Sequence, residues 1–193
     1  MPDYEIIAEG SVDGSAPSTI VLSGIPADYT HLELTFNSAS TRSSGSYNDY
    51  IYLQFNGDST SGNYCRVYSY KADGVGTPTQ AAQGFGPSDP QTSIFFGISP
   101  TRWVGQSTQL MTYSRFYIPN YSGTTLTKSA IIWNMCAGAY DWPGTGGSNS
   151  GTAVQNTVGG WDDTSAITSI TLASYEAGFG FAVNSSYILA GIK

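Results

Sequence analysis

The residues that most often perform catalysis are scarce in this chain of 193 residues. It has one histidine, His31, and two cysteines, Cys65 and Cys136. A Ser-His-Asp or Cys-His arrangement would have to be built around His31, which falls on the polar face of a strand predicted at 31–37. We therefore interpret His31 as a surface or strand-pairing histidine. The CxxC, HExxH and P-loop motifs are absent, and three scattered Cys and His residues predict neither a metal site nor a cofactor.

Paired carboxylates are the other route to catalysis, because a glycosidase on a β-sandwich needs only two well-placed acids. The acids on or beside predicted strands and turns are Glu9, Glu33, Glu176, Asp162 and Asp163. Spacing along the chain does not place any two of them across a cleft, so the sequence favours solvent-facing charges and a protein that is not an enzyme. The turn at 56–59, Asn-Gly-Asp-Ser, offers oxygen ligands for calcium but lacks the acidic density of a calcium loop. We interpret it as a plain turn.

The aromatic residues say more about binding. Fourteen Tyr and four Trp accompany few charges, and these side chains supply large, rigid contact area with a hydrogen-bonding tip. Trp142 lies in a Gly-rich stretch, where it either stacks on a sugar, packs on a neighbouring subunit, or folds back onto its own loop. The pair Arg102 and Trp103 poses the same choice, with packing inside the fold favoured. The candidate contact residues are Tyr140, Asp141, Trp142, Arg102 and Trp103.

Composition indicates the fold class and excludes some partners. Gly, Pro, Tyr, Ser and Thr favour turns and strands, whereas strong helix formers are sparse, with four Glu and three Lys. We predict an all-β protein. Charged residues make up 11% of the chain, with a net charge of −7. The seven Lys and Arg form no cluster that could neutralise phosphates, which argues against nucleic acid and anionic membranes as partners.

Strict alternation of apolar and polar residues identifies individual strands. The stretch 31–37 places Leu32, Leu34 and Phe36 on one face, and 50–56 repeats the pattern before an Asn-Gly turn that predicts a hairpin with 63–70. The predicted strands are 4–9, 19–22, 31–37, 50–56, 63–70, 93–98, 109–118, 129–137, 167–172 and 187–192.

The sequence also predicts how the chain ends and where two long loops lie. The last two predicted strands are expected to be joined by a polar turn, so that the C-terminus lies inside a sheet with no tail after it. The stretches 71–90 and 138–151 are rich in Gly and are expected to be loops. Roughly eight to ten strands in one domain over 1–193 predict a single-domain β-sandwich of jelly-roll type.

The N-terminal residues lack a basic region followed by an apolar stretch, and no apolar run approaches the length of a membrane span. We therefore expect no classical secretion signal. Cys65 and Cys136 are expected to be free thiols in a chain made in a reducing cytoplasm, with a disulfide between them as the alternative.

A series of short motifs carries one family resemblance. They are Tyr4-Glu5-Ile6-Ile7-Ala8, Ile25-Pro26-Ala27-Asp28-Tyr29-Thr30-His31-Leu32, Phe55-Asn56-Gly57-Asp58, Phe116-Tyr117-Ile118-Pro119-Asn120-Tyr121, Trp161, Ile167-Thr168-Ser169-Ile170 and Ala190-Gly191-Ile192-Lys193. Their order, over nearly the whole chain, resembles a family of tailed-bacteriophage virion proteins, including capsid accessory and tail-fibre components. The chain departs from that pattern at Ala190, where an aromatic residue usually precedes Gly-Ile-Lys.

The resemblance implies a non-enzymatic part of the virion, assembled in the host cytoplasm without a secretion signal and without a cofactor. Two binding roles then compete. The first is a capsid decoration or cement protein that stabilises the shell and contacts the major capsid protein and copies of itself, as a trimer or another symmetric oligomer. The second is a tail-fibre or receptor-binding domain that recognises a host surface glycan. We expect the first, because all residues of the chain are predicted to belong to one globular domain.

Overall fold

The chain folds into β-strands joined by turns and loops. A computed structural model describes residues 3–42, 48–72, 79–83, 91–100, 111–139, 150–175 and 177–193. These residues contain twelve strands and no helix, which confirms the all-β prediction. The strands are β1 (Tyr4–Ser11), β2 (Thr19–Ser23), β3 (His31–Ser38), β4 (Asn48–Phe55), β5 (Tyr64–Ala72), β6 (Thr79–Gln83), β7 (Ile94–Pro100), β8 (Thr112–Pro119), β9 (Lys128–Ala139), β10 (Ser150–Trp161), β11 (Ser169–Ser174) and β12 (Ser186–Ile192).

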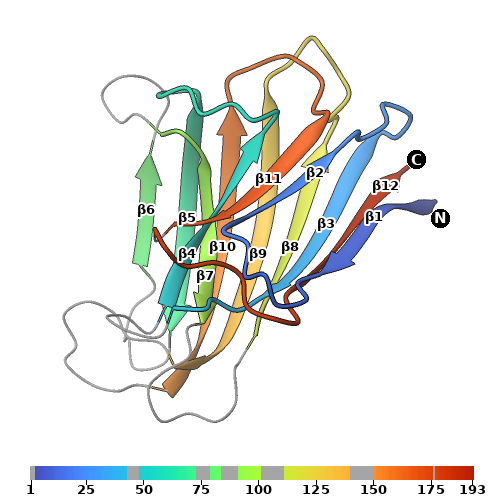
Figure 1. The fold of residues 1–193 in the computed structure, drawn as a ribbon. Coiled ribbons are helices and arrows are strands. Elements are labelled where there is room, and N and C mark those ends of the chain that lie inside the picture. Colours follow the sequence, from blue (N-terminus) through green and yellow to red (C-terminus); the bar gives the residue numbers. More distant parts are fainter. Residues whose placement is uncertain are drawn as a thin grey trace.

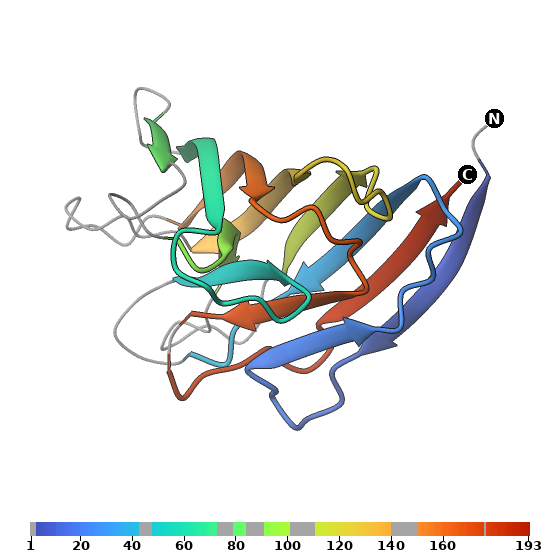
Figure 2. The ribbon, with the colours of Figure 1, turned by 90° about the horizontal axis from the view of Figure 1, so that it is seen from above.

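The strands form two antiparallel sheets (Figure 1). The large sheet has the order β1-β12-β3-β8-β9-β10-β5-β6, and the small sheet has the order β2-β11-β4-β7. Figure 2 shows the small sheet lying along one side of the large one. The large sheet therefore has an inner face, which points towards the small sheet, and an outer face, which points away from it.

The core lies between the two sheets and comes from the strands with the clearest alternation. In β3, Leu32, Leu34 and Phe36 are fully buried, as predicted, and β4 buries its apolar face in the same way. The Phe96 ring of β7 meets the Phe116 ring of β8 edge to face, with the ring centroids 4.5 Å apart. Full burial of such side chains stabilises the fold by roughly 1.5–3 kcal/mol each. Both sheets contribute to one apolar cluster.

The C-terminal strand lies inside the large sheet, as predicted. β12 pairs with β1 on one side and with β3 on the other. The ring of Tyr29 packs directly on Gly191, where a Cβ atom would come within 2.2 Å of the ring. A side chain at Gly191 would therefore force this ring away from the sheet.

The predicted hairpin of the stretches 50–56 and 63–70 is wrong, because β4 belongs to the small sheet and β5 to the large one. The last two strands, β11 and β12, are likewise divided between the two sheets. The turn after β4 does form, with Asn56 and Gly57 at φ angles of 53° and 67°. It carries the chain from one sheet to the other instead of folding β5 back onto β4. Alternation identifies the buried face of a strand but not the strand beside it, so this error could not be seen in the sequence.

Two segments expected to be loops contain strands. β6 lies within 71–90, and β9 and β10 reach into 138–151 from its two sides. The prediction also missed the rest of β10, which is the longest strand of the structure together with β9. Its sequence, SGTAVQNTVGGW, is poor in large apolar residues and carries three glycines, so it lacks the usual composition of a central strand.

The two cysteines are free thiols. Cys65 of β5 lies opposite Gly160 of β10, whereas Cys136 of β9 lies opposite Ala153 of the same strand. Seven residues of β10 separate these two positions, which corresponds to roughly 23 Å along a strand. The disulfide alternative is therefore excluded by distance in this fold.

Candidate functional site

Strand β10 buries two polar side chains on its inner face and exposes two valines on its outer face. Gln155 and Thr157 are 3% and 1% exposed on the inner face. Val154 and Val158 are 43% and 54% exposed on the outer face. A strand that separates a core from water shows the opposite pattern. At these four positions β10 therefore reverses that pattern, with Asn156 as the exposed polar residue between the two valines.

The neighbouring strand β9 presents apolar residues on the same side. Ile131, Trp133 and Met135 alternate with the buried residues Ile132 and Asn134 and are 37%, 41% and 47% exposed. Exposed apolar residues that occur singly are common on protein surfaces, but a contiguous group of them marks an interaction surface. The strand register shows which of these two cases applies.

The register places the exposed residues of four strands next to one another. Val158 of β10 lies opposite Val67 of β5 on one side and Ile131 of β9 on the other. Two rows further along, Met135 of β9 lies opposite Val154 of β10 and Tyr113 of β8. Trp133 occupies the row between them. We call this surface the outer apolar face, which consists of Val67, Tyr113, Ile131, Trp133, Met135, Val154 and Val158.

One ion pair borders the outer apolar face. The guanidinium of Arg115, opposite Trp133 in the register, donates a hydrogen bond of 2.7 Å to the Glu33 carboxylate on β3. This hydrogen bond and the charge of Glu33 raise the pKa of Arg115. The same guanidinium lies 5.9 Å from the centre of the Trp133 ring, in a cation–π contact. The pair thus holds a cation beside the central tryptophan without adding net charge to the surface.

Beneath the outer apolar face, the inner side of the sheet contains a layer of buried polar groups. The Asn134 amide donates to the Ser114 hydroxyl at 2.8 Å, and the Gln155 amide donates to the Thr157 hydroxyl at 3.0 Å. Gly97 of β7 packs on Asn134, with an added Cβ only 2.3 Å from its amide nitrogen. Buried polar groups hydrogen-bonded in this way fix the positions of β9 and β10, so the outer apolar face has a rigid support.

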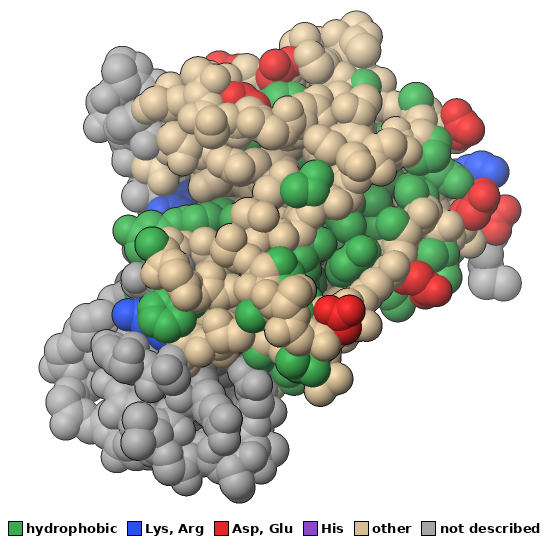
Figure 3. All heavy atoms as spheres, in the orientation of Figure 1, with side chains coloured by type: hydrophobic (Ala, Val, Ile, Leu, Met, Phe, Trp, Pro, Cys, Tyr) green, Lys and Arg blue, Asp and Glu red, His purple; other side chains and the backbone are tan. Residues whose placement is uncertain are grey.

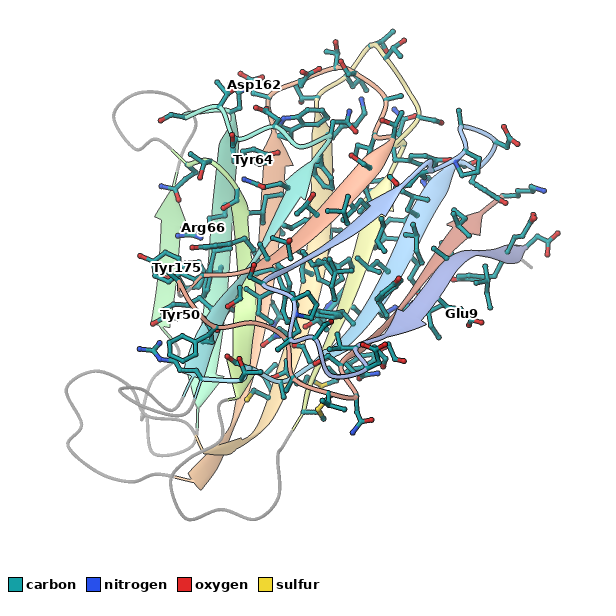
Figure 4. The ribbon with its side chains drawn as sticks, viewed as in Figure 1. Glu9, Tyr50, Tyr64, Arg66, Asp162 and Tyr175 are labelled. Atoms are coloured by element: carbon teal, nitrogen blue, oxygen red, sulfur yellow. The ribbon has the colours of Figure 1, made fainter. Side chains whose placement is uncertain are left out.

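A second aromatic group lies at the side of the molecule near β4, β5 and β7. Tyr50 meets Phe95 and Tyr175 edge to face, with centroid distances of 5.0 and 6.0 Å. The guanidinium of Arg66 lies 4.8 Å from the centre of the Phe95 ring. Figure 4 shows Tyr50, Tyr175 and Arg66 on the same side of the structure. We call Tyr50, Tyr52, Tyr68, Phe95, Tyr175 and Arg66 the tyrosine cluster.

The tyrosine cluster is packed more tightly than the outer apolar face. Only Tyr175 is widely exposed among its described rings, at 55%, and the other members are half-buried against one another. Figure 3, in the same orientation, shows Lys and Arg side chains beside hydrophobic ones on the left-hand side, where Figure 4 places Tyr50, Tyr175 and Arg66. An exposed tyrosine edge beside an arginine is suited to contact with a polar ligand such as a sugar.

The turn considered for calcium is held by hydrogen bonds within the protein. Asp58 accepts hydrogen bonds from the Thr60 amide at 2.8 Å, the Asn63 side chain at 2.9 Å and the Trp161 indole at 2.6 Å. Burial raises the pKa of Asp58, but the hydrogen bonds from Trp161, Asn63 and Thr60 outweigh that effect and lower it to about 2. Both carboxylate oxygens are used in this way, so Asp58 has a structural role at the end of β10.

The sequence-predicted catalytic candidates are not brought together. The ring Nδ1 of His31 accepts a hydrogen bond from the Asn120 amide at 3.2 Å, and its ring leans on Tyr117. Glu9 and Glu33 both belong to the large sheet, but β12 lies between their strands and their rows are two residues apart, which places their Cα atoms roughly 12 Å from each other. Glu33 is also bound to Arg115. Retaining and inverting glycosidases require carboxyl groups about 5–9.5 Å apart, in a cleft around the bond to be cleaved.

The remaining acids lie elsewhere. Asp162 is exposed at the end of β10, far from Glu9 in Figure 4. Asp163 accepts a hydrogen bond from the Ser165 amide at 2.6 Å, and this bond lowers its pKa. Glu176 falls outside the described residues. Within the part of the chain that the structure describes, no group of three or more His, Cys, Asp or Glu residues could hold a metal ion.

The predicted contact residues cannot be compared with the structure. Tyr140, Asp141, Trp142, Arg102 and Trp103 all fall outside the described residues. The outer apolar face, by contrast, was not predicted. Two signals for it were present in the sequence. Ile131, Trp133 and Met135 alternate with Ile132 and Asn134, so neither side of this strand is polar throughout. The second signal was the pair of valines in the overlooked strand β10.

Comparisons with known proteins do not name a relative. No family model matches this chain. No curated protein and no solved structure matches it either. The described residues also contain no helix with the length and hydropathy needed to cross a bilayer. The resemblance to phage virion proteins therefore stays a prediction, and the surfaces described above must support any statement about function.

Proposed function

We propose that this chain is a non-enzymatic structural protein of a bacteriophage virion, most simply a capsid decoration or cement protein. In this role it binds the outside of the shell and stabilises it by burying apolar area between neighbouring subunits. Its partners would be the major capsid protein and other copies of the chain. The outer apolar face is the single observation that carries the proposal, because such a surface is suited to permanent contact with protein and poorly suited to water.

We also propose that the fold is a jelly roll enlarged by two insertions. A jelly roll has eight strands in two sheets. Eight strands here pair as nested couples, β1 with β12, β2 with β11, β3 with β8, and β4 with β7. The other four, β5 with β6 and β9 with β10, widen the large sheet beyond β8. Jelly rolls are frequent in viral capsid proteins, which agrees with the proposed role by analogy of fold.

The insertions carry most of the outer apolar face. Six of its seven residues lie on β5, β9 and β10, and one, Tyr113, lies on β8. In the proposed function, the eight nested strands supply a stable support and the added strands supply the surface that binds other proteins. This division accounts for the buried polar residues of β9 and β10, which are Asn134, Gln155 and Thr157. Their inner side needs only to close the sandwich, whereas their outer side must be apolar to bind.

The proposal can be tested by adding the purified chain to phage capsids that lack it and imaging the particles. We expect density at regular positions on the lattice and greater resistance of the shell to heat. Trp133→Glu should reduce occupancy, because it places a charge at the centre of the outer apolar face. Val21→Glu, at a 59% exposed valine on β2 of the small sheet, is the matched control and should bind as the natural sequence does. Absence of lattice density for the natural sequence would refute the proposal.

A tail-fibre or receptor-binding role is the second candidate, and the tyrosine cluster supports it. Tyr175 is exposed beside Tyr50 and Tyr52, at centroid distances of 6.0 and 5.3 Å, and offers an aromatic edge for a host surface glycan. A glycan array with the natural sequence and with Tyr175→Ala separates the two functions. Glycan binding that is lost in Tyr175→Ala and kept in Trp133→Glu would favour the fibre role.

A further inference from the structure

We propose that the outer apolar face packs against the same face of a second copy of this chain, forming a two-fold symmetric dimer. This inference rests on the proposed role of the face as a protein-binding surface and names its partner. The shell would then be contacted by other parts of the molecule, and loss of the dimer would lower occupancy because a dimer binds the lattice at two points. Three observations lead to this partner: the area of the face, its lack of unpaired acidic residues, and its position on neighbouring strands of one sheet.

The area is suited to an interface between two proteins. The seven side chains each leave between 36% and 58% of their surface exposed. Together they offer on the order of 600 Å² of surface, which equals the largest patches found on typical monomers. A stable interface buries about 800 Å² on each partner. The outer apolar face reaches that size once the polar residues between and around it, such as Asn156 and Arg115, are included.

The charge distribution favours a second copy over a charged partner. Two copies of a chain with a net charge of −7 repel each other over most approaches. On its four strands, the three rows of the outer apolar face contain no acidic residue. Glu33 of the neighbouring strand β3 is neutralised by Arg115, and Lys71 lies opposite Val154 at the end of one row. This face is therefore a surface on which two copies can meet without bringing their acidic residues together.

The shape of the face points to two-fold symmetry. All seven residues lie on the outer side of four neighbouring strands of one sheet, so they form a single surface that points in one direction. A trimer requires two different surfaces on each subunit, whereas a two-fold dimer needs one surface that meets itself. Two β-sheets pack face to face about 10 Å apart, with their strands rotated by about 30°.

Trp133 is the expected centre of this interface. It lies in the middle row, between the row of Val158 and the row of Met135. Its ring is already positioned by the cation–π contact with Arg115, which Glu33 holds in turn. Large aromatic side chains in the middle of an interface, surrounded by less important contacts, contribute most of the binding energy. The β1 edge of the large sheet is less suited to self-association, because this edge strand bears Glu5 and Glu9.

Sedimentation velocity of the complete chain over about a hundredfold range of concentration tests the dimer. We expect a monomer–dimer equilibrium for the natural sequence, and little weakening at high salt, because the contact is apolar. Trp133→Glu and Val158→Glu should each weaken dimerisation at least tenfold. Val21→Glu should dimerise as the natural sequence does. Circular dichroism shows that each variant compared is folded, and two independent substitutions keep the test valid when one of them does not fold.

Several results would overturn the inference. A natural sequence that stays monomeric throughout, or that forms a trimer, contradicts it. So does a dimer that both Trp133→Glu and Val158→Glu leave intact. The capsid experiment is separate, since a chain that dimerises through this face but never binds a capsid refutes the proposed function and keeps the dimer. A monomer that binds capsids through Trp133 refutes the dimer and keeps the function.

Discussion

Strands β3 and β10 both lie inside the large sheet, but their side chains follow opposite patterns. β3 buries Leu32 and Leu34 and turns polar residues outwards. β10 buries Gln155 and Thr157 and turns its valines outwards. The first pattern separates a core from water. The second leaves apolar side chains exposed. Under the proposed function, the two parts of the sheet therefore serve different roles, folding for β3 and assembly for β10.

The largest expected effect concerns the β3 side of this comparison. Phe36 is fully buried and meets the ring of Phe181 edge to face, with the centroids 5.1 Å apart. Phe36→Ala should lower the free energy of unfolding by about 3–5 kcal/mol, because it removes the buried ring and leaves a cavity. Urea denaturation followed by tryptophan fluorescence measures this loss. Thr35→Ala, on the outer side of the same strand, is the control and should change the stability little.

The next effect concerns the inner side of β10. Gly159 faces Ile94 of β7, and an added Cβ would come within 2.5 Å of its side chain. Gly159→Ala should therefore cost about 1–3 kcal/mol by overpacking, although alanine is better suited to a strand than glycine. Thermal unfolding of this variant checks the prediction. A neutral or stabilising result would show that β10 is not held closely against β7.

A smaller effect is expected at the end of β10, where Asp58 binds the Trp161 indole. In the folded chain the pKa of Asp58 is about 2, below the ordinary value near 3.9 in an unfolded chain. The unfolded state therefore takes up the proton first as the pH falls. The stability that Asp58 contributes is fully present above about pH 4 and is lost towards pH 2. Asp58→Asn should be about 1 kcal/mol less stable at neutral pH.

The difference between Asp58→Asn and the natural sequence should shrink as the pH falls through this window. Urea denaturation at several pH values between neutral and strongly acidic conditions measures it. Asp162→Asn, at an exposed neighbouring acid, is the matched control. A difference that is the same at every pH would mean that Asp58 stabilises the turn through its shape and not through its charge.

The sequence was sufficient to predict the strands whose apolar side chains are also the buried ones. The alternation in β3 and β4 and the apolar run of β12 predicted these strands, because their buried sides face the core. It was not sufficient for β10, whose buried positions before Trp161 are Gln, Thr and Gly. The partner of β5 was also missed, since the residues of a strand do not state in which sheet it pairs. The outer apolar face depends on both of these features, so it became visible only when the register joined four strands.

The smallest change in stability is expected on the outer side of β10. A substitution there tests whether the exposed valines of β10 have a protein partner. Val158 is 54% exposed, so Val158→Thr, which keeps the shape of the side chain, should alter the unfolding free energy of the dilute monomer by less than about 0.5 kcal/mol. The same substitution occurs twice in a two-fold dimer. Loss of roughly one buried methyl group on each side should weaken dimerisation about tenfold, a value that sedimentation velocity can resolve. Val21→Thr on β2 should change neither quantity. If Val158→Thr also leaves association unchanged, the valines of β10 have no partner on this side and its contrast with β3 carries no functional meaning.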